Sequence, residues 1–228
     1  MRETLAAETE TIERQRDLLR SYDRMGNIYA GDHNLDESQI WFEKALDLAR
    51  RLIERNPSSA LAKEDLLITM SSYTKTLNDA GLRGRSVALA REALATAKEL
   101  ANQDSSPRWL RRLAIHHSYL ADALKTSGSA EEVRDELGAS LDIFRRLAAL
   151  NQGSADAQRD YSIALERMAE ITAEAGDESG AIGLYRQSLA IARKLAEAHP
   201  ENTQLQRDLA ITESSLAKLE DSLGGTGG

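Results

Sequence analysis

The sequence contains no cysteine, only three prolines and few aromatic residues, which make up 4% of its 228 residues. Without cysteine, the chain has no disulfide framework, no thiolate nucleophile and no cysteine-ligated zinc, and a reducing compartment suits such a composition. We therefore expect a cytoplasmic protein. The aromatic and β-branched strings that form strands are missing, whereas the helix-favouring residues Ala, Leu, Glu and Arg are abundant. The composition predicts an all-α fold.

Long apolar runs are also missing. No stretch approaches the roughly 20 apolar residues of a membrane span, and acids interrupt the N-terminal segment, so we expect neither a membrane helix nor a secretory signal. The 29 basic and 37 acidic residues leave a net charge of −8, which repels phosphate backbones and anionic membranes. Nucleic acid and membrane are therefore not expected as partners. The hydrophobic content of 41% is enough for a sizeable core, and the length allows one domain or two.

A segment recurs five times with a period of about 48 residues. The copies align, with steps of 48, 47, 48 and 48, on these residues: Asp17, Asp65, Arg112, Asp160 and Asp208. Three apolar columns keep the same register: Leu18, Leu66, Leu113, Tyr161 and Leu209; Met25, Tyr73, Leu120, Met168 and Leu216; Leu5, Leu52, Leu100, Leu147 and Leu195. Within each copy the apolar residues follow a helical period. Each copy therefore predicts a pair of helices, which we call helix A and helix B.

Turn-forming residues separate the predicted helices. They lie at residues 31–34, 81–84, 128–129 and 176–177 inside the pairs, and at residues 56–57, 105–107, 153–154 and 199–200 between the pairs. The helices are predicted over residues 10–30, 35–56, 58–80, 84–103, 107–127, 130–151, 154–175, 178–198 and 202–222. We expect a single array over residues 1–222, with units near 16–63, 64–110, 111–158 and 159–206, a capping helix at 207–222 and a flexible Gly-rich tail at 223–228.

The units resemble the tetratricopeptide repeat family. The first unit carries the family's residue types at Tyr22, Met25, Gly26, Tyr29, Ser38, Phe42 and Ala45, and the fourth carries them at Leu165, Met168, Gly176, Asp177, Ala181, Tyr185 and Ser188. The second and third units are more degenerate. The family's proline near the end of helix B is replaced by Arg50, Lys98, Arg145 and Arg193, so helix B is expected to run about two turns longer. The chain is similar to a lengthened variant of the repeat.

This resemblance implies a right-handed superhelical α-solenoid with a concave wall of A helices that binds partners. The ligand-facing positions of the family correspond here to Arg20, Asp23, Arg24, Asn27, Ser71, Ser72, Lys75, Asn78, Tyr119, Asp122, Lys125, Glu166, Arg167 and Glu170. We call these 14 residues the A-helix surface, and they predict a polar groove of mixed charge. The carboxylate clamp of chaperone-binding members is not matched, because Asp23, Ser72, Ile115 and Tyr119 occupy four of its places. A chaperone C-terminal peptide is therefore not the expected ligand.

The two ends of the chain carry separate signals. Residues 5–8 correspond to residues 195–198, so the chain is expected to open on the tail of a helix B and to be the C-terminal section of a longer protein. A homodimer that forms through the unpaired face of this N-terminal helix is a further possibility. At the other end, Glu213 and Glu220 replace bulky residues of earlier units, and a polar outer face is typical of a terminal cap.

Catalytic and metal-binding patterns are weak. His116 and His117 are neighbours on a predicted helix, so their side chains point about 100° apart and cannot share an ion, and no ligand follows at the spacing of HExxH. The glycine-rich stretch 81–84 lacks the Lys-Ser/Thr of a phosphate loop. We predict packing for the histidine pair, solvated turns for His33 and His199, and no enzyme activity, metal or cofactor.

Basic pairs and tryptophans are the remaining candidates for a binding site. The pairs at residues 50–51, 111–112 and 145–146 are typical of solvated helix faces and C-terminal helix turns, and an acidic-peptide or RNA site is the alternative. For Trp41 and Trp109 we favour core packing, with an interface anchor beside arginines as the alternative.

The sequence supplies a long polar surface and no reaction centre. We therefore expect an interaction scaffold that binds a protein or peptide along the concave A-helix surface. The alternative is a sensor or regulatory array of a larger signalling protein, with an effector domain upstream such as an ATPase, protease or kinase.

Overall fold

The computed structural model describes the backbone of residues 2–125 and 128–224, and the side chains of residues 11–125 and 128–222. Within these ranges the chain forms α-helices and no strand, which confirms the all-α prediction. The helices are α1 (Arg2–Gly31), α2 (Leu35–Arg55), α3 (Ala60–Asp79), α4 (Arg83–Gln103), α5 (Pro107–Leu124), α6 (Ala130–Leu150), α7 (Ala155–Glu174), α8 (Glu178–Ala198) and α9 (Thr203–Gly224).

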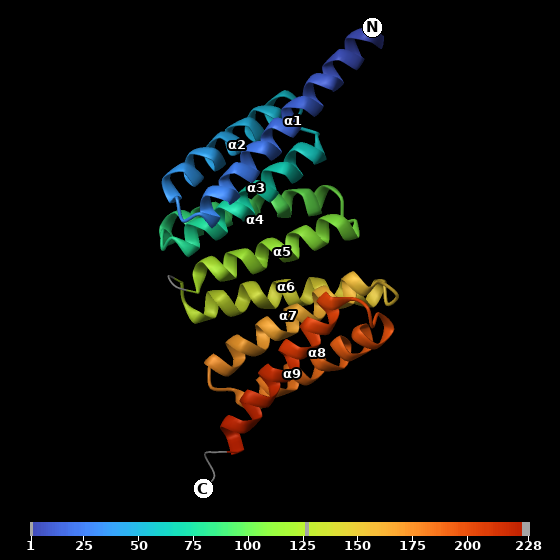
Figure 1. Ribbon diagram of the computed structural model, residues 1–228. Helices are drawn as coiled ribbons and strands as arrows, with labels where there is room; N and C mark the ends of the chain where they lie inside the picture. The colour runs from blue at the N-terminus through green and yellow to red at the C-terminus, as the bar shows by residue number, and fades with distance from the viewer. Residues whose placement is uncertain (1, 126–127, 225–228) are drawn as a thin grey trace. The chain divides into compact units, whose positions relative to one another are not determined.

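The described chain divides into two compact units. Unit 1 holds α1 to α4 with residues 107–109 and 119–124 of α5, and unit 2 holds residues 110–118 of α5 with α6 to α9. In unit 1, α1 contacts α2 and α3, while α3 contacts α2 and α4. In unit 2, α6 contacts α7, α7 contacts α8, and α8 contacts α9. Within each unit, successive helices run antiparallel and pack in series (Figure 1).

Side-chain caps and left-handed turns define the helix ends. Asn34, Ser59, Ser154 and Asp177 each precede a helix, and their side-chain oxygens accept a hydrogen bond from a backbone N–H of the first turn. Positive φ angles occur at His33 (58°), Gly81 (73°) and Gly176 (86°), where the chain reverses inside a helix pair. These turns lie where the sequence predicts them.

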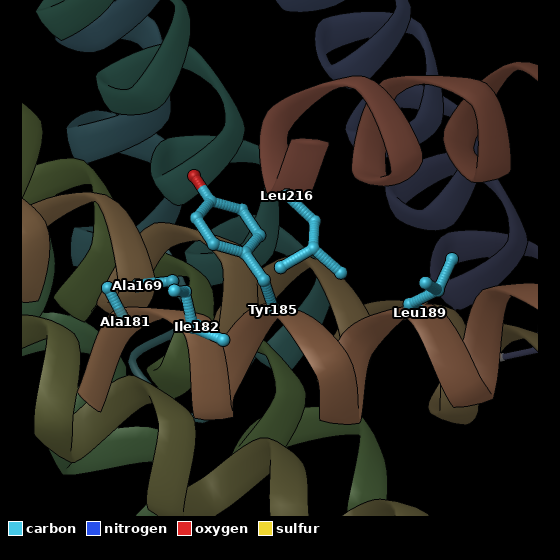
Figure 2. Packing of buried hydrophobic residues seen from close by; sticks show 6 residues of the cluster. All are labelled: Ala169, Ala181, Ile182, Tyr185, Leu189 and Leu216. Atoms are coloured by element: carbon cyan, nitrogen blue, oxygen red, sulfur yellow. The ribbon is translucent and has the colours of Figure 1, made fainter. Parts of the chain in front are cut away.

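Two of the three apolar columns supply much of the cores of the two units, whereas in the column that begins at Leu18 only Leu66 is buried and Leu18 is exposed. In the column that ends at Leu195, all four residues whose side chains are described are buried. The column that begins at Met25 is less completely buried. Its members Tyr73, Leu120 and Leu216 are buried, whereas Met25 and Met168 are half-buried. Figure 2 shows part of the core of unit 2, where Tyr185 of α8 lies beside Leu216 of α9, with Ala169, Ala181 and Ile182 alongside.

A close approach of α1 to α2 depends on glycine. A Cβ atom at Gly26 would lie 2.8 Å from the ring of Phe42, and the hydroxyl of Ser38 donates a hydrogen bond to the carbonyl oxygen of Gly26 at 2.8 Å. Phe42 is fully buried and stacks on Tyr73, with ring centroids 5.1 Å apart. The small residue at this family position therefore lets the aromatic ring of helix B pack against the backbone of helix A.

Two predictions about the chain ends need correction. The first helix is continuous over Arg2–Gly31, so residues 5–8 are not the tail of a separate helix B. No glycine, proline or capping turn interrupts residues 2–25, so nothing ends the helix there. At the other end, α9 extends to Gly224, so the predicted tail does not begin at residue 223. The rest of that tail, residues 225–228, lies outside the described residues.

Candidate functional site

The residues of the A-helix surface lie on four helices and none of them is buried. Unit 1 carries the members on α1 and α3, together with Tyr119, Asp122 and Lys125 at the end of α5, and unit 2 carries Glu166, Arg167 and Glu170 on α7. Within unit 1 the Asn78 side-chain amide donates to the Asp122 carbonyl oxygen at 3.5 Å, so members from α3 and α5 are in contact. The structure therefore brings the unit 1 members together on neighbouring helices. The concave position of the set stays a prediction.

A hollow of about 200 Å³ lies between α1 and α3. We call it the α1–α3 hollow. Its lining includes three members of the A-helix surface, and the lining residues are Leu19, Arg20, Asp23, Arg24, Asp65, Ile68 and Thr69. Among the described residues, Asp23 Oδ1 and Thr69 Oγ1 are buried atoms without a hydrogen bond of normal geometry, although the Thr69 and Ser72 hydroxyls lie near enough to the Asp23 carboxylate to oppose the rise in its pKa. The other carboxylate oxygen of Asp23 accepts a hydrogen bond from the Asn27 amide at 3.1 Å. Burial raises the pKa of Asp23 above its ordinary value, although neighbouring hydroxyl and amide groups oppose the shift.

A second, smaller hollow of about 40 Å³ lies in unit 2 between α7 and α9. Here Glu166 Oε1 accepts hydrogen bonds from the hydroxyls of Ser188, at 2.8 Å, and Thr212, at 2.5 Å. Burial raises the pKa of Glu166, and the two hydroxyl donors oppose that shift. We call it the α7–α9 hollow, and its carboxylate is satisfied within the fold.

The two hollows occupy the same place in the repeat. In the sequence alignment Asp23 and Glu166 stand at equivalent positions, and so do Thr69 and Thr212 of the following helices A. An acid on one helix A thus faces the junction with the next helix A in both units. The difference is that two hydroxyls donate hydrogen bonds of normal geometry to Glu166, whereas the hydroxyls near Asp23 form no such bond with its Oδ1 in the described chain.

Ion pairs join successive A helices beside these hollows. Arg16 Nε contacts Asp65 Oδ2 at 2.5 Å in unit 1, and Arg159 Nε contacts Asp208 Oδ2 at 2.5 Å in unit 2. Arg111 makes the equivalent contact with Asp160. Each arginine immediately precedes an aligned position, so the sequence held a signal for these pairs that the resemblance to the family did not use. The aligned aspartates therefore hold one helix A to the next.

A column of isoleucines, which the polar family positions do not include, lies on the A helices. The residues three positions after the aligned ones in the later copies are Ile68, Ile115, Ile163 and Ile211. Ile68 is 41% exposed and Ile211 is 48% exposed, while the other two are half-buried. Ile68 lines the α1–α3 hollow, and Ile163 and Ile211 line the α7–α9 hollow. The A helices thus present apolar groups beside their charges, in addition to the predicted polar groove.

The histidine pair has a packing role. His116 and His117 are both buried, and burial, with the nearby charge of Arg112, lowers the pKa of His116 to about 4. His117 Nδ1 lies 2.5 Å from Glu136 Oε2. His33 and His199 are exposed at turns, as expected. In the part of the chain with described side chains, no group of three or more His, Asp or Glu residues is placed to hold a metal ion.

The tryptophans and basic pairs are engaged within the fold. Trp109 is only 4% exposed and lies under the Arg108 guanidinium, so its alternative interpretation as an interface anchor is wrong. Trp41 is half-buried against Tyr22, with ring centroids 5.5 Å apart. The basic pairs contact acids, as Arg50 does with Glu92 at 2.9 Å. They are therefore interspersed with negative charge, which does not favour an RNA site.

No helix among the described residues is long and apolar enough to cross a membrane.

Comparisons with known proteins identify the repeat and the fold. Residues 18–58 match a family model described as a tetratricopeptide repeat. The crystal structure of BtubC (BKLC) from P. vanneervenii is similar, with a TM-score of 0.50, 15% sequence identity, and coverage of 98% of this chain and 92% of that one. A crystal structure of MamA protein is similar with a TM-score of 0.37, 17% identity, and coverage of 91% and 94%. A search of curated proteins found no match. The likeness to BtubC shows a shared fold alone.

Proposed function

We propose that this chain, which carries a tetratricopeptide repeat at residues 18–58, is a non-enzymatic scaffold that binds a protein or peptide along its A helices. The repeat supports a protein-interaction scaffold in general. The proposal goes further by assigning the binding surface to the A-helix surface, together with the exposed isoleucines that lie beside it.

The α1–α3 hollow carries the proposal. An unpaired acceptor at a buried site costs about 1–3 kcal/mol, and a donor from a bound segment can recover that free energy. Asp23 Oδ1 is a buried atom that lacks a hydrogen bond of normal geometry, although the Thr69 and Ser72 hydroxyls lie nearby, and Arg20, Arg24 and Ile68 line the same hollow. A peptide that brings an N–H or ammonium donor to Asp23, an acid to the arginines and an apolar side chain to Ile68 would match all three features.

The mixed charge of the surface gives the complex an electrostatic character. Arg24 and Lys75 are exposed in unit 1, and Glu170 is exposed in unit 2. Lys75 contacts Asp79 at 2.6 Å, but both side chains are more than half exposed, so this ion pair contributes at most about 1 kcal/mol. Affinity for the partner is therefore expected to weaken as salt screens these charges.

A charge reversal tests the assignment. The double variant Arg24→Glu/Lys75→Glu is expected to lower affinity for a captured partner by about tenfold or more, because two cations of the surface become repulsive. Partners would first be captured on the purified chain and identified by mass spectrometry, and affinity would then be measured by calorimetry. The matched control is Arg83→Glu/Lys98→Glu, which reverses two exposed cations on α4. Equal affinity of both double variants for the partner would move the site away from the A helices.

A separable proposal concerns self-association through the first helix. Ile12 and Leu18 on α1 are 40% and 44% exposed, so a homodimer through this helix would cover apolar side chains. Sedimentation velocity of the chain and of its Leu18→Glu variant tests this: a concentration-dependent dimer that the variant loses supports it, and a monomer at high concentration refutes it.

A further inference from the structure

Unit 2 contains a cavity of about 620 Å³ among α6, α7 and α8. It shares no residue with the A-helix surface or with the exposed isoleucine column. Its volume falls within the range of about 300–1,000 Å³ that is typical of ligand sites. The three helices that form it lie in the lower half of Figure 1.

The cavity is cationic, although the protein as a whole is acidic. Arg145 of α6, Lys194 of α8 and His199 at the end of α8 line it, and no Asp or Glu occurs among its lining residues in the described chain. Arg145 contacts Asp142 at 2.8 Å, but both side chains are more than 60% exposed. Such a surface pair contributes little, so Arg145 can exchange Asp142 for another anion at small cost.

Apolar side chains line the cavity together with these cations, and we call them the apolar floor. Ile191 of α8 and Tyr161 of α7 line the cavity with several alanines, and both are half-buried. Gln152, which follows α6, adds an exposed side-chain amide to the rim. An aliphatic group can pack on this floor while a carboxylate reaches the cations, and the amide can pair with a peptide backbone.

The corresponding place in unit 1 differs at one of the two cation positions. In the repeat alignment, Lys194 corresponds to Arg146, Glu99 and Arg51 in the preceding copies, and Arg145 corresponds to Lys98 and Arg50. Glu99 accepts a hydrogen bond from Lys63 at 2.9 Å, and this contact lowers the pKa of Glu99. In the equivalent place of unit 1 the Lys194 position therefore carries an acid while the Arg145 position keeps a cation, so the combination of the two cations is not common to both units.

We propose that this cavity is a second binding site, which takes an acidic side chain of a short apolar peptide segment. The carboxylate contacts Arg145 and Lys194, the flanking aliphatic side chains pack on Ile191 and Tyr161, and the Gln152 amide pairs with the peptide backbone. A fatty acid offers the same carboxylate and alkyl chemistry but cannot use that amide, which favours the peptide.

The test uses the full chain with labelled isoleucine methyl groups and three probes. These are the peptide acetyl-Leu-Glu-Leu-amide, its neutral counterpart acetyl-Leu-Gln-Leu-amide, and octanoate. The acidic peptide is expected to shift the Ile191 methyl signal saturably, and to bind about tenfold more tightly than the neutral peptide and more tightly than octanoate. The Ile68 methyl, in the α1–α3 hollow, is expected to stay unshifted, so the result is independent of the proposed A-helix surface.

Charge reversal at the cavity supplies the matched comparison. Lys194→Glu is expected to weaken binding of the acidic peptide by about tenfold or more, whereas Lys218→Glu, an exposed lysine of α9 outside the cavity, is expected to leave it unchanged. Circular dichroism melts would show that both variants fold. Equal binding of the two peptides, equal loss in the two variants, or absence of a saturable Ile191 shift would overturn the proposal. Tighter binding of octanoate would overturn the assignment to a peptide.

Discussion

Asp23 and Glu166 occupy equivalent positions of two A helices but have different surroundings. Glu166 receives two hydroxyl hydrogen bonds, from Ser188 and Thr212, whereas Asp23 Oδ1 receives none within the described chain. Hydrogen bonds from hydroxyl groups replace the bonds to water that a carboxylate loses on burial. A buried oxygen without such a donor keeps the full desolvation cost. Glu166 is therefore partly buried and hydrogen-bonded within unit 2, while the proposed contact with a ligand falls on Asp23.

Glu166 also predicts a dependence of stability on pH. Burial raises its pKa above the ordinary value of 4.5, so the folded state keeps the proton over a pH range in which the unfolded state has lost it. The stability that protonated Glu166 contributes is fully present below pH 4.5 and is lost as the pH rises through the raised pKa. Relative to Glu166→Gln, the wild-type chain is expected to become less stable as the pH rises from 4.5 to neutrality.

Urea unfolding of the two proteins at matched pH values measures this difference. Glutamine keeps a side-chain oxygen that can accept from Ser188 and Thr212, so the comparison isolates the titration. A stability difference that does not vary with pH, or that varies in the opposite sense, would contradict the prediction.

At the scale of helices, arginine–aspartate pairs connect α1 with α3, α5 with α7, and α7 with α9. Arg159 and Asp208 are 32% and 20% exposed, so their contact between α7 and α9 is partly shielded from water. Such a pair also favours one position of α9 along the axis of α7, because the guanidinium and the carboxylate come within contact distance only there. In the repeat alignment, Glu64 stands at the position of Arg159 and Arg112 stands at the position of Asp208, so the acid and the base are exchanged between these two positions.

Removing Arg159 is expected to destabilise unit 2. Arg159→Ala should lower the free energy of unfolding by about 1–3 kcal/mol, because Asp208 loses its charged partner in a partly buried setting and keeps only the Gln204 amide as a side-chain donor. The control Arg186→Ala breaks the more exposed pair with Glu220 and should cost at most about 1 kcal/mol. Chemical denaturation measures both. The double exchange Arg159→Asp/Asp208→Arg should recover part of the loss, and equal losses in the two single variants would show that the pair does not hold the helices together.

At the scale of the whole molecule, contacts are local. Within each unit, a helix contacts the helices next to it in the chain, and α1 also contacts α3. Each unit buries its own set of hydrophobic residues. In such repeat architectures stability is close to a sum of local contributions, so damage in one region need not spread.

Leu216→Ala is therefore expected to weaken α7, α8 and α9 without loosening α1 to α3. Leu216 is buried against Tyr185 and Ala169 in the core of unit 2, and its truncation should cost about 2–4 kcal/mol. Hydrogen exchange followed by mass spectrometry would show faster exchange in α7 to α9 alone. Met70→Ala is the reciprocal variant, since Met70 is fully buried in α3 of unit 1. Faster exchange along the whole chain in either variant would mean that the chain unfolds as one cooperative body.

Much of this fold follows from local patterns. The alternation of apolar columns with turn residues at 31–34 and 176–177 predicts the helices to within a few residues, because a helix end depends on caps and glycines close in sequence. The continuous first helix was missed because an alignment with residues 195–198 suggested a break that no local residue enforces. Among the candidate site residues, Arg24 and Lys75 are exposed. Ile68 is also exposed, but it is not among the predicted site residues because only polar side chains were assigned to the ligand-facing positions.

The sequence by itself determined the helical class, the pairing of helices A and B, the resemblance to the tetratricopeptide repeat and the absence of familiar catalytic motifs, because each of these depends on spacing along one chain. Only the tertiary structure decided which polar groups are satisfied and which are not. The hydroxyls that serve Glu166 come from α8 and α9, the unpaired oxygen of Asp23 lies at a junction with α3, and the cationic cavity draws its residues from three helices. Partners so distant in sequence meet only when helices pack, and burial, which sets the cost of an unpaired charge, exists only in the folded chain.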